Sequence, residues 1–204
     1  MPMRTRVGAL IAVAVTGLAL GATLAAPADA APAAAPKFLS ASELPPHPSS
    51  AWKAGKVTDG VPDDLLSCLT EALPGYDSRY RSFTTELETN AQQLTIVVGT
   101  EAKAKALASR FDKDMRSCAT RIEQAEPETD ATYKGYGTLP VEEGARVHGL
   151  HTATSWGASD IHLVSVGRDG RTVTVVQWGQ MGDFEDAPVK AFKKTTTTAV
   201  RKLY

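Results

Sequence analysis

A run of alternating apolar residues near the carboxyl end most constrains how this chain can fold. Residues 161–178 read "IHLVSVGRDGRTVTVVQW", with β-branched side chains on both sides of Asp169-Gly170. An Asp-Gly pair between two such runs is a strong signal for a hairpin with a two-residue turn. In this register Val166 lies opposite Val173. The sequence therefore predicts two long neighbouring antiparallel strands.

Both faces of this predicted hairpin are largely apolar, with Leu163 and Val176 on one face and Val164 and Val175 on the other. Such strands are expected at the centre of a sheet that is covered on both sides, or along a cleft. Further strands are predicted in the segments "LTIVVG", "TYKGYGTLPV" and "ARVHGLHTATSW". The second half of the chain is thus mainly β.

Two longer helices and a short one complete the pattern. Thr100 can cap a helix whose apolar stripe is Leu107, Phe111, Met115, Cys118 and Ile122. A short helix is predicted after Pro62, and a closing helix after Asp186, which we expect to be its N-cap. We therefore predict an α+β fold, an antiparallel sheet with two main helices packed on one face.

The amino terminus has the composition of a secretory signal. Arg4 and Arg6 precede an apolar run that ends near Ala28-Asp29-Ala30, and we expect cleavage after Ala30. The alternative is a retained membrane anchor, because a run of about 20 apolar residues can also span a bilayer. Cleavage leaves a secreted chain without a stable membrane span.

Residues 31–62 form a second compositional unit, rich in proline and alanine. Repeated prolines prevent a regular helix, so this leader is predicted to be extended or loosely ordered. Trp52 interrupts it, and we expect this side chain to dock on the surface of the following domain. Residues 63–204 are then a single α+β domain.

Cys68 and Cys118 are the chain's two cysteines. In an exported protein an even count favours a disulfide, and each residue falls on the apolar stripe of a predicted helix. The bond would join the short helix to the long one. On the loop-closure model, closing a loop of this length stabilises the fold by about 4 kcal/mol.

The charges and motifs exclude several classes of function. Removing Arg4, Arg6 and Asp29 with the signal leaves 20 basic and 22 acidic side chains, without the basic runs that nucleic-acid binding needs. The sequence has no Gly-x-Ser-x-Gly elbow and no phosphate-binding glycine loop. His148 and His151 are three apart, so on a strand they point to opposite faces and do not form a metal site. We predict no enzyme activity, catalytic residue, metal or cofactor.

One polar group in the hairpin is a candidate binding site. The predicted register places His162 beside Gln177 at the end of an otherwise apolar face, and Gln180 follows shortly after. One interpretation is that the strand simply emerges into water at this point. The other is that His162, Gln177 and Gln180 form the rim of a ligand cleft.

The order of these parts resembles a known family. An early cysteine, the strand "LTIVVG", a long helix ending in "MRSCA", a β-rich second half with "VTVVQWGQ" and a closing helix are similar to the PknH-like extracellular sensor domains of bacteria. The resemblance implies an antiparallel sheet packed by helices, a broad ligand-binding cleft and no catalysis. Members of this family occur outside bacterial membrane kinases and also as free secreted or lipoprotein relatives, and this chain resembles a free secreted member. The resemblance also suggests two disulfides, whereas this chain has cysteines for one only, and it has neither a kinase domain nor a lipid-attachment cysteine.

Two functions follow as hypotheses. The first is a secreted, non-catalytic sensor-like domain that binds a small molecule or cell-wall fragment at or outside the cell envelope. The second is a protein–protein interaction factor that uses its proline-rich leader and exposed aromatic residues to contact another exported protein. A deep apolar cleft would favour the first, and an exposed apolar patch around Trp52 or Trp156 the second.

Overall fold

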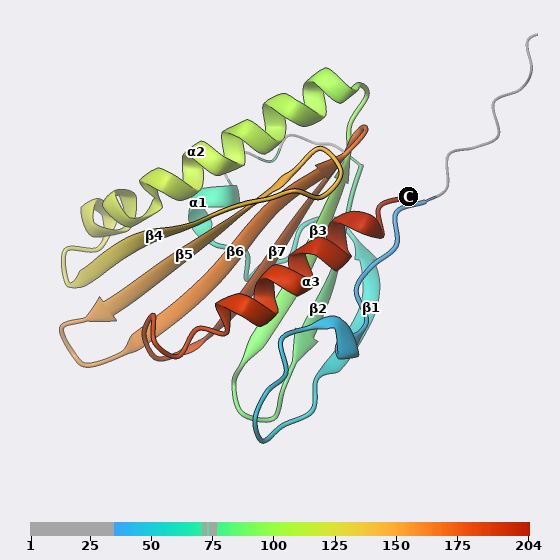
Figure 1. The fold of residues 1–204 in the computed structure, drawn as a ribbon. Helices are drawn as coiled ribbons and strands as arrows, with labels where there is room; N and C mark the ends of the chain where they lie inside the picture. Colours follow the sequence, from blue (N-terminus) through green and yellow to red (C-terminus); the bar gives the residue numbers. More distant parts are fainter. Residues whose placement is uncertain (1–34, 71–72, 74–76) are drawn as a thin grey trace, which may run out of the picture. The chain divides into compact units, whose positions relative to one another are not determined.

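The computed structural model describes residues 35–70, 73 and 77–204, and its centre is a seven-stranded antiparallel sheet with two main helices packed against it (Figure 1). The predicted signal and its cleavage after Ala30 lie outside the described residues. The elements in chain order are η1 (Ala41–Glu43), β1 (Lys53–Asp59), α1 (Ser67–Thr70), β2 (Asp77–Thr84), β3 (Asn90–Val97), α2 (Glu101–Ala125), β4 (Thr129–Leu139), β5 (Ala145–Thr154), β6 (Ser159–Asp169), β7 (Thr172–Met181) and α3 (Val189–Arg201). No helix in these ranges is long and apolar enough to cross a membrane.

The strands are ordered β1-β2-β3-β7-β6-β5-β4. The last strand of the chain is therefore inserted between β3 and β6, at the centre of the sheet. Residues 172–179 of β7 are all buried. This burial agrees with the sequence, because a strand with apolar side chains on both faces is stable only where both faces are covered.

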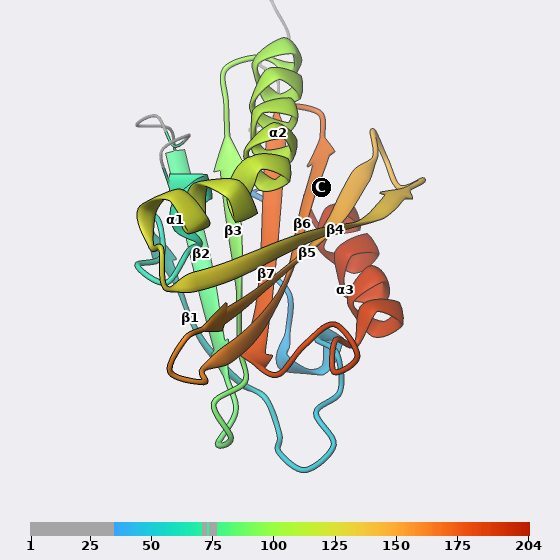
Figure 2. The same cartoon turned by 90° about the vertical axis from the view of Figure 1, so that its left-hand side faces the viewer.

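The two main helices lie on opposite faces of the sheet, which corrects the prediction that they share one face (Figure 2). On one side, called here the α2 face, Phe111 and Met115 of α2 pack with Leu94. On the other, the α3 face, Phe192 of α3 packs with Trp178. A single amphipathic helix covers one face only, and the central strands are apolar on both, so each face needs its own cover.

The β6–β7 hairpin has the predicted faces but a different register. Asp169 pairs with Thr172, so the two turn residues are Gly170 and Arg171 rather than Asp169 and Gly170. Gly170 has a φ of 51°, and glycine at the first turn position is favoured in type II′ hairpins. The pairing is shifted by two residues, which keeps every side chain on its predicted face because strand faces alternate with a period of two.

The changed register separates the pair of residues predicted to be side by side. His162 pairs with Gly179, and Gln177 pairs with Val164. His162 and Gln177 still share the α2 face, but as diagonal rather than direct neighbours. Leu163, likewise, lies opposite Trp178.

The predicted disulfide is confirmed. Cys68 in α1 and Cys118 in α2 are joined, with their Cα atoms 5.5 Å apart. The Thr100 cap is also confirmed, since its hydroxyl accepts a hydrogen bond from the Lys103 amide at 3.2 Å. The N-cap of α3 is Pro188 rather than Asp186, whose carboxylate instead accepts a bond from the Asp183 amide at 2.9 Å.

The described part of the proline-rich leader lies on the α3 face. Leu39 and Leu44 are buried in its core, and Trp52 is partly buried against the same cluster, as expected. The Leu39 amide donates to Gln93 Oε1 at 2.7 Å. Residues 53–59 then form β1, an edge strand paired with β2. The leader therefore contributes both a strand and part of the cover of the α3 face.

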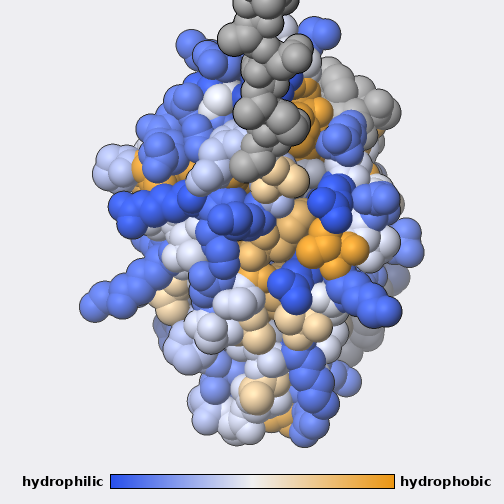
Figure 3. Space-filling model, turned by 90° about the vertical axis from the view of Figure 1, so that its right-hand side faces the viewer, coloured by the Kyte–Doolittle hydropathy of each residue, from blue (hydrophilic) through white to orange (hydrophobic). Residues whose placement is uncertain are grey.

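Large apolar side chains on the surface of the described chain are few. The exposed ones are Leu87, Trp156, Met181 and Tyr204. On the side drawn in Figure 3, apolar residues form a narrow band that is flanked by polar and charged residues. Any apolar contact with a partner is thus restricted to small areas.

Candidate functional site

The structure gives Gln177 a clear structural contact. Its side chain is buried, its Oε1 accepts from the Leu66 amide at 3.0 Å, and its Nε2 donates to the Asp64 carbonyl at 3.0 Å. These two bonds attach the segment before α1 to the α2 face. Both ends of the amide are therefore used within the fold.

His162 and Gln180 do not join Gln177 in one cluster. The His162 ring lies over Gly179, where an added β-carbon would be 2.6 Å from Nδ1, and burial lowers the pKa of this histidine. Gln180 alternates to the other side of β7, and its Oε1 is 3.5 Å from the Thr89 hydroxyl. Within the described residues, no hydrogen bond links these three side chains.

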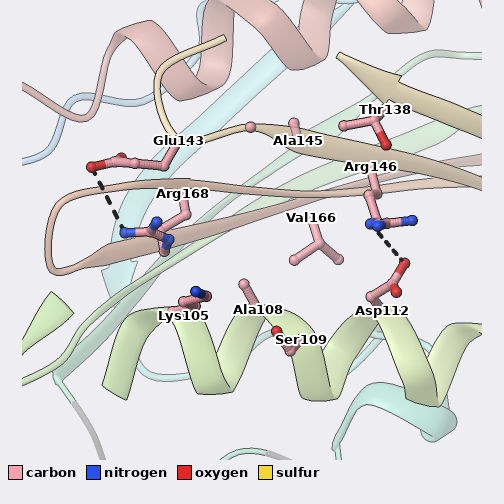
Figure 4. A pocket seen from close by; sticks show the side chains of 11 residues that line it. Lys105, Ala108, Ser109, Asp112, Thr138, Glu143, Ala145, Arg146, Val166 and Arg168 are labelled. Carbon is pink, nitrogen blue, oxygen red and sulfur yellow. Dashed lines mark ion pairs between the residues drawn. The ribbon is translucent and has the colours of Figure 1, made fainter. Parts of the chain in front are cut away.

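A charged groove elsewhere on the α2 face is the better candidate site. It is a hollow of about 290 Å³ between the first half of α2 and strands β4, β5 and β6, beside the β4–β5 turn (Figure 4). Ala108, Ala145 and Val166 supply its apolar lining. A concave apolar surface with a few convergent polar groups is the usual form of a small-molecule site.

Five charged side chains surround this groove. Lys105 and Asp112 come from α2, Glu143 from the β4–β5 turn, and Arg146 and Arg168 from β5 and β6. Side chains alternate along β5 and β6, and those of the even-numbered residues face α2. Arg146 and Arg168 therefore both point toward the helix, as Figure 4 shows. Alternation along β5 and β6 therefore brings two guanidinium groups to the same hollow.

The side chains that line the groove include three cations and two carboxylates. Arg168 Nη1 is 3.7 Å from Glu143 Oε1, and Arg146 Nε is 3.6 Å from Asp112 Oδ1. Among the described residues, Lys105 has no carboxylate partner. Three lining cations thus face two carboxylates that are already shared, and the carboxyl groups of Glu142 and Asp169 lie beside Glu143 and Arg168. An added anion would gain favourable Coulomb energy chiefly from Lys105 and Arg146.

A smaller hollow of about 200 Å³ lies near the groove and is lined in part by Arg116, Tyr133, Arg146 and His148. Asp112 forms ion pairs with two of these residues, Arg116 and Arg146. Arg116 donates to Asp112 through Nε and Nη2, at 3.2 and 3.3 Å, and this contact raises the pKa of the arginine. The two hollows share Arg146. One carboxylate therefore positions two arginines that face neighbouring cavities.

His148 lies under this cluster as a neutral group. It is 1 % exposed, its Nδ1 is 2.9 Å from the Tyr133 hydroxyl, and its Nε2 is 3.4 Å from Asp112 Oδ1. Burial lowers the pKa of His148 to about 4, although Asp112 acts in the opposite direction. Burial also raises the pKa of Tyr133. Both rings are uncharged at neutral pH.

This arrangement is suited to holding an anion. Arginine offers a planar fork of donors that matches carboxylate and phosphate oxygens, and Lys105 adds a flexible point charge. Within the described ranges, no three His, Cys, Asp or Glu side chains are grouped to hold a metal ion. His151, the other candidate histidine, is 2.9 Å from the Ser159 hydroxyl instead.

The groove was not predicted from the sequence because its residues are far apart in the chain. Arg146 and Arg168 belong to no recognisable motif. The one available signal was the presence of arginine on the face of β5 and β6 that otherwise carries apolar residues. Pairing of Arg146 with Val166 shows how the strands bring these positions together.

Comparison with known proteins adds no relative. No protein-family model matches the chain, and no curated protein matches its sequence. The resemblance to PknH-like sensor domains therefore stays a prediction from the order of the elements.

Proposed function

We propose that this protein is a secreted, non-catalytic ligand-binding domain of the PknH sensor type, acting at or outside the cell envelope. Its binding site is the groove between α2 and strands β4–β6, and its ligand is a small molecule or cell-wall fragment with an anionic group. The observation that carries the proposal is Lys105, unpaired among the described residues, facing Arg146 and Arg168 across an apolar lining.

The titratable groups beside the groove support a non-catalytic role. Tyr133 and His148 are the nearest groups able to transfer protons, and burial shifts the pKa of each away from neutrality. A general acid or base works best when its pKa is near the working pH. Tyr133 and His148 are therefore poorly suited to general acid–base catalysis, and they bond each other at 2.9 Å.

Thermal-shift measurements test the proposal directly. The protein is screened against acidic metabolites, inorganic phosphate and muropeptides, with neutral analogues of each. A ligand at a hundred times its dissociation constant stabilises the folded state by about 2.7 kcal/mol, which raises Tm by several degrees. We expect acids, and not their neutral analogues, to give such a shift.

Matched variants then locate the site. Lys105→Gln and Arg146→Gln should abolish the shift, while Lys113→Gln, an exposed lysine on another face of the same helix, should preserve it. No shift with any acid, or equal loss in all three variants, would show that the groove is not the binding site.

The alternative function, as a protein-interaction factor, is favoured by a different part of the molecule. Trp52 is not available for a partner, since it packs on the α3 face and its Nε1 donates to the Pro45 carbonyl at 2.7 Å. Trp156, in contrast, is 68 % exposed. Any such contact is therefore expected at Trp156 rather than at the leader.

A further inference from the structure

Trp156 belongs to a surface at the end of the sheet far from the groove. We call this the strand-end surface and define it as residues 85–89, 126–130, 155–160 and 181–186. We propose that the strand-end surface docks a polypeptide partner that presents apolar side chains surrounded by lysine and arginine. This inference is independent of the groove and its ligand.

Three exposed apolar side chains carry the proposal. Leu87, Trp156 and Met181 are 54, 68 and 64 % exposed, and they make up three of the four exposed large apolar residues in the described chain. Burying such side chains removes apolar area from water, and tryptophan is enriched at the centres of protein interfaces. These three side chains therefore offer apolar area to a partner.

Strand pairing brings these three residues to one end of the sheet. Met181 pairs with Asp160, just after the turn that holds Trp156. On the other side of β7, Gly179 pairs with Asn90, at the end of the turn that holds Leu87. Met181 therefore lies at the end of the strand between those that carry the two turns, and both turns are at the same end of their strands in the sheet, although they lie apart in Figure 1.

The charges around these residues specify the partner. The strand-end surface contains no lysine or arginine and nine acidic residues, namely Glu86, Glu88, Glu126, Glu128, Asp130, Asp160, Asp183, Glu185 and Asp186. The α2–β4 connection belongs to it because the Ser155 amide donates to the Glu128 carbonyl at 2.9 Å. Two lysines lie beside it: Lys53 Nζ is 2.9 Å from Glu86 Oε1, and Lys134 Nζ is 5.2 Å from the centre of the Phe184 ring.

An acidic rim around apolar side chains favours one class of partner. Complementary charge steers association and excludes partners of the same sign, while the apolar contacts supply affinity. An anionic lipid surface would be repelled by these carboxylates. A polypeptide with basic and apolar side chains matches both the acidic rim and the exposed apolar residues. A second copy of this chain, which would present its cationic groove, is an alternative occupant that the test distinguishes.

The test uses a short amphipathic peptide of lysine and leucine as the probe, with a glutamate and leucine peptide of the same pattern as its control. Binding to the full chain is measured by fluorescence anisotropy at low and at physiological ionic strength. We expect the lysine peptide alone to bind, and more weakly as salt rises. Failure of the lysine peptide to bind overturns the proposal.

Variants separate the apolar from the electrostatic part. Replacing both Trp156 and Met181 by alanine should weaken binding at least about tenfold, as loss of central interface residues does. Glu128→Gln with Glu185→Gln should weaken it several-fold and reduce the salt dependence. Asp77→Asn with Glu101→Gln, which removes equal charge outside this surface, should leave binding unchanged. Equal weakening in the control pair, or none in the alanine variant, overturns the proposal.

Two further readouts distinguish other outcomes. Lys105→Gln should not affect peptide binding, so a failed groove proposal leaves this one standing. Sedimentation of the chain alone should show no self-association as its concentration is raised. The result that would contradict this is self-association that Trp156→Ala abolishes. In that case the occupant is a second copy of the chain, and the proposed heterologous partner is wrong.

Discussion

On the α2 face of the sheet, ionisable side chains gather around a hollow, whereas on the α3 face the buried polar side chains are uncharged. Asp112, His148 and Arg146 lie together beside the groove. On the other face, Gln93 bonds the Leu39 amide at 2.7 Å and the Thr174 hydroxyl at 3.2 Å. From this difference we propose that the α2 face binds the ligand and that the α3 face supports the fold.

The covers of the two faces differ in the same way. α2 is attached through apolar contacts and the disulfide to α1, and it leaves the groove open at its amino-terminal half. α3 and the leader close the other face, and Thr195 donates to the Glu43 carbonyl at 2.6 Å between them. Because the disulfide holds α2 in place, the groove beside this helix can keep its shape although no side chains fill it.

The largest expected effect breaks the clamp on the α2 face. Replacing Cys68 and Cys118 by alanine should lower the free energy of unfolding by about 4 kcal/mol, because the unfolded chain regains the entropy of an open loop. Urea denaturation measures the loss. Hydrogen exchange should show faster opening of α2 than of α3, and equal acceleration in both helices would mean that the two covers are not independent.

The next effect tests close packing on the α3 face. Gly167 has no space for a side chain, since a β-carbon there would collide with Val200 of α3. Gly167→Val should therefore destabilise the protein by about 3 kcal/mol through overpacking. Adding Val200→Ala should restore part of this loss in thermal denaturation. A stable single variant would show that α3 is held more loosely than described.

A smaller effect should appear as a pH dependence from the α2 face. The pKa of His148 is lowered to about 4 in the folded state, below its ordinary value of 6.5, so the unfolded state binds its proton first as pH falls. Stability is then lost between pH 6.5 and 4, by about 2 kcal/mol between pH 7 and 5. His148→Gln should remove this part of the slope in urea titrations. A variant with the wild-type slope would mean that other groups cause it.

The sequence was sufficient for features that depend on local pattern or covalent chemistry. The pairing of Cys68 with Cys118, the cap at Thr100 and the faces of the hairpin residues were predicted correctly. Each follows from residue type, spacing or the period of a strand. The resulting α+β class with an antiparallel sheet and two main helices was predicted as well.

Features that depend on long-range geometry were not predictable in the same way. The hairpin register depends on whether Asp169 or Gly170 begins the turn, and both positions suit a two-residue loop. The sides taken by α2 and α3 depend on how connections cross the sheet. The groove requires Asp112 and Arg146, separated in the chain by β4, to meet, which no local pattern in the sequence specifies.

We propose that the groove on the α2 face holds an anion between Arg146 and Arg168. The most direct measurement is an NMR titration of the arginine side-chain Nε–H signals with inorganic phosphate, citrate and a muropeptide, with Arg79, paired with Asp59 near the β1 edge, as the internal reference. We predict that the signals of Arg146 and Arg168 shift together and saturate with at least one of these anions, while the signal of Arg79 stays unchanged. Small, unsaturated shifts of all three arginines, or no shift at all, would contradict the account.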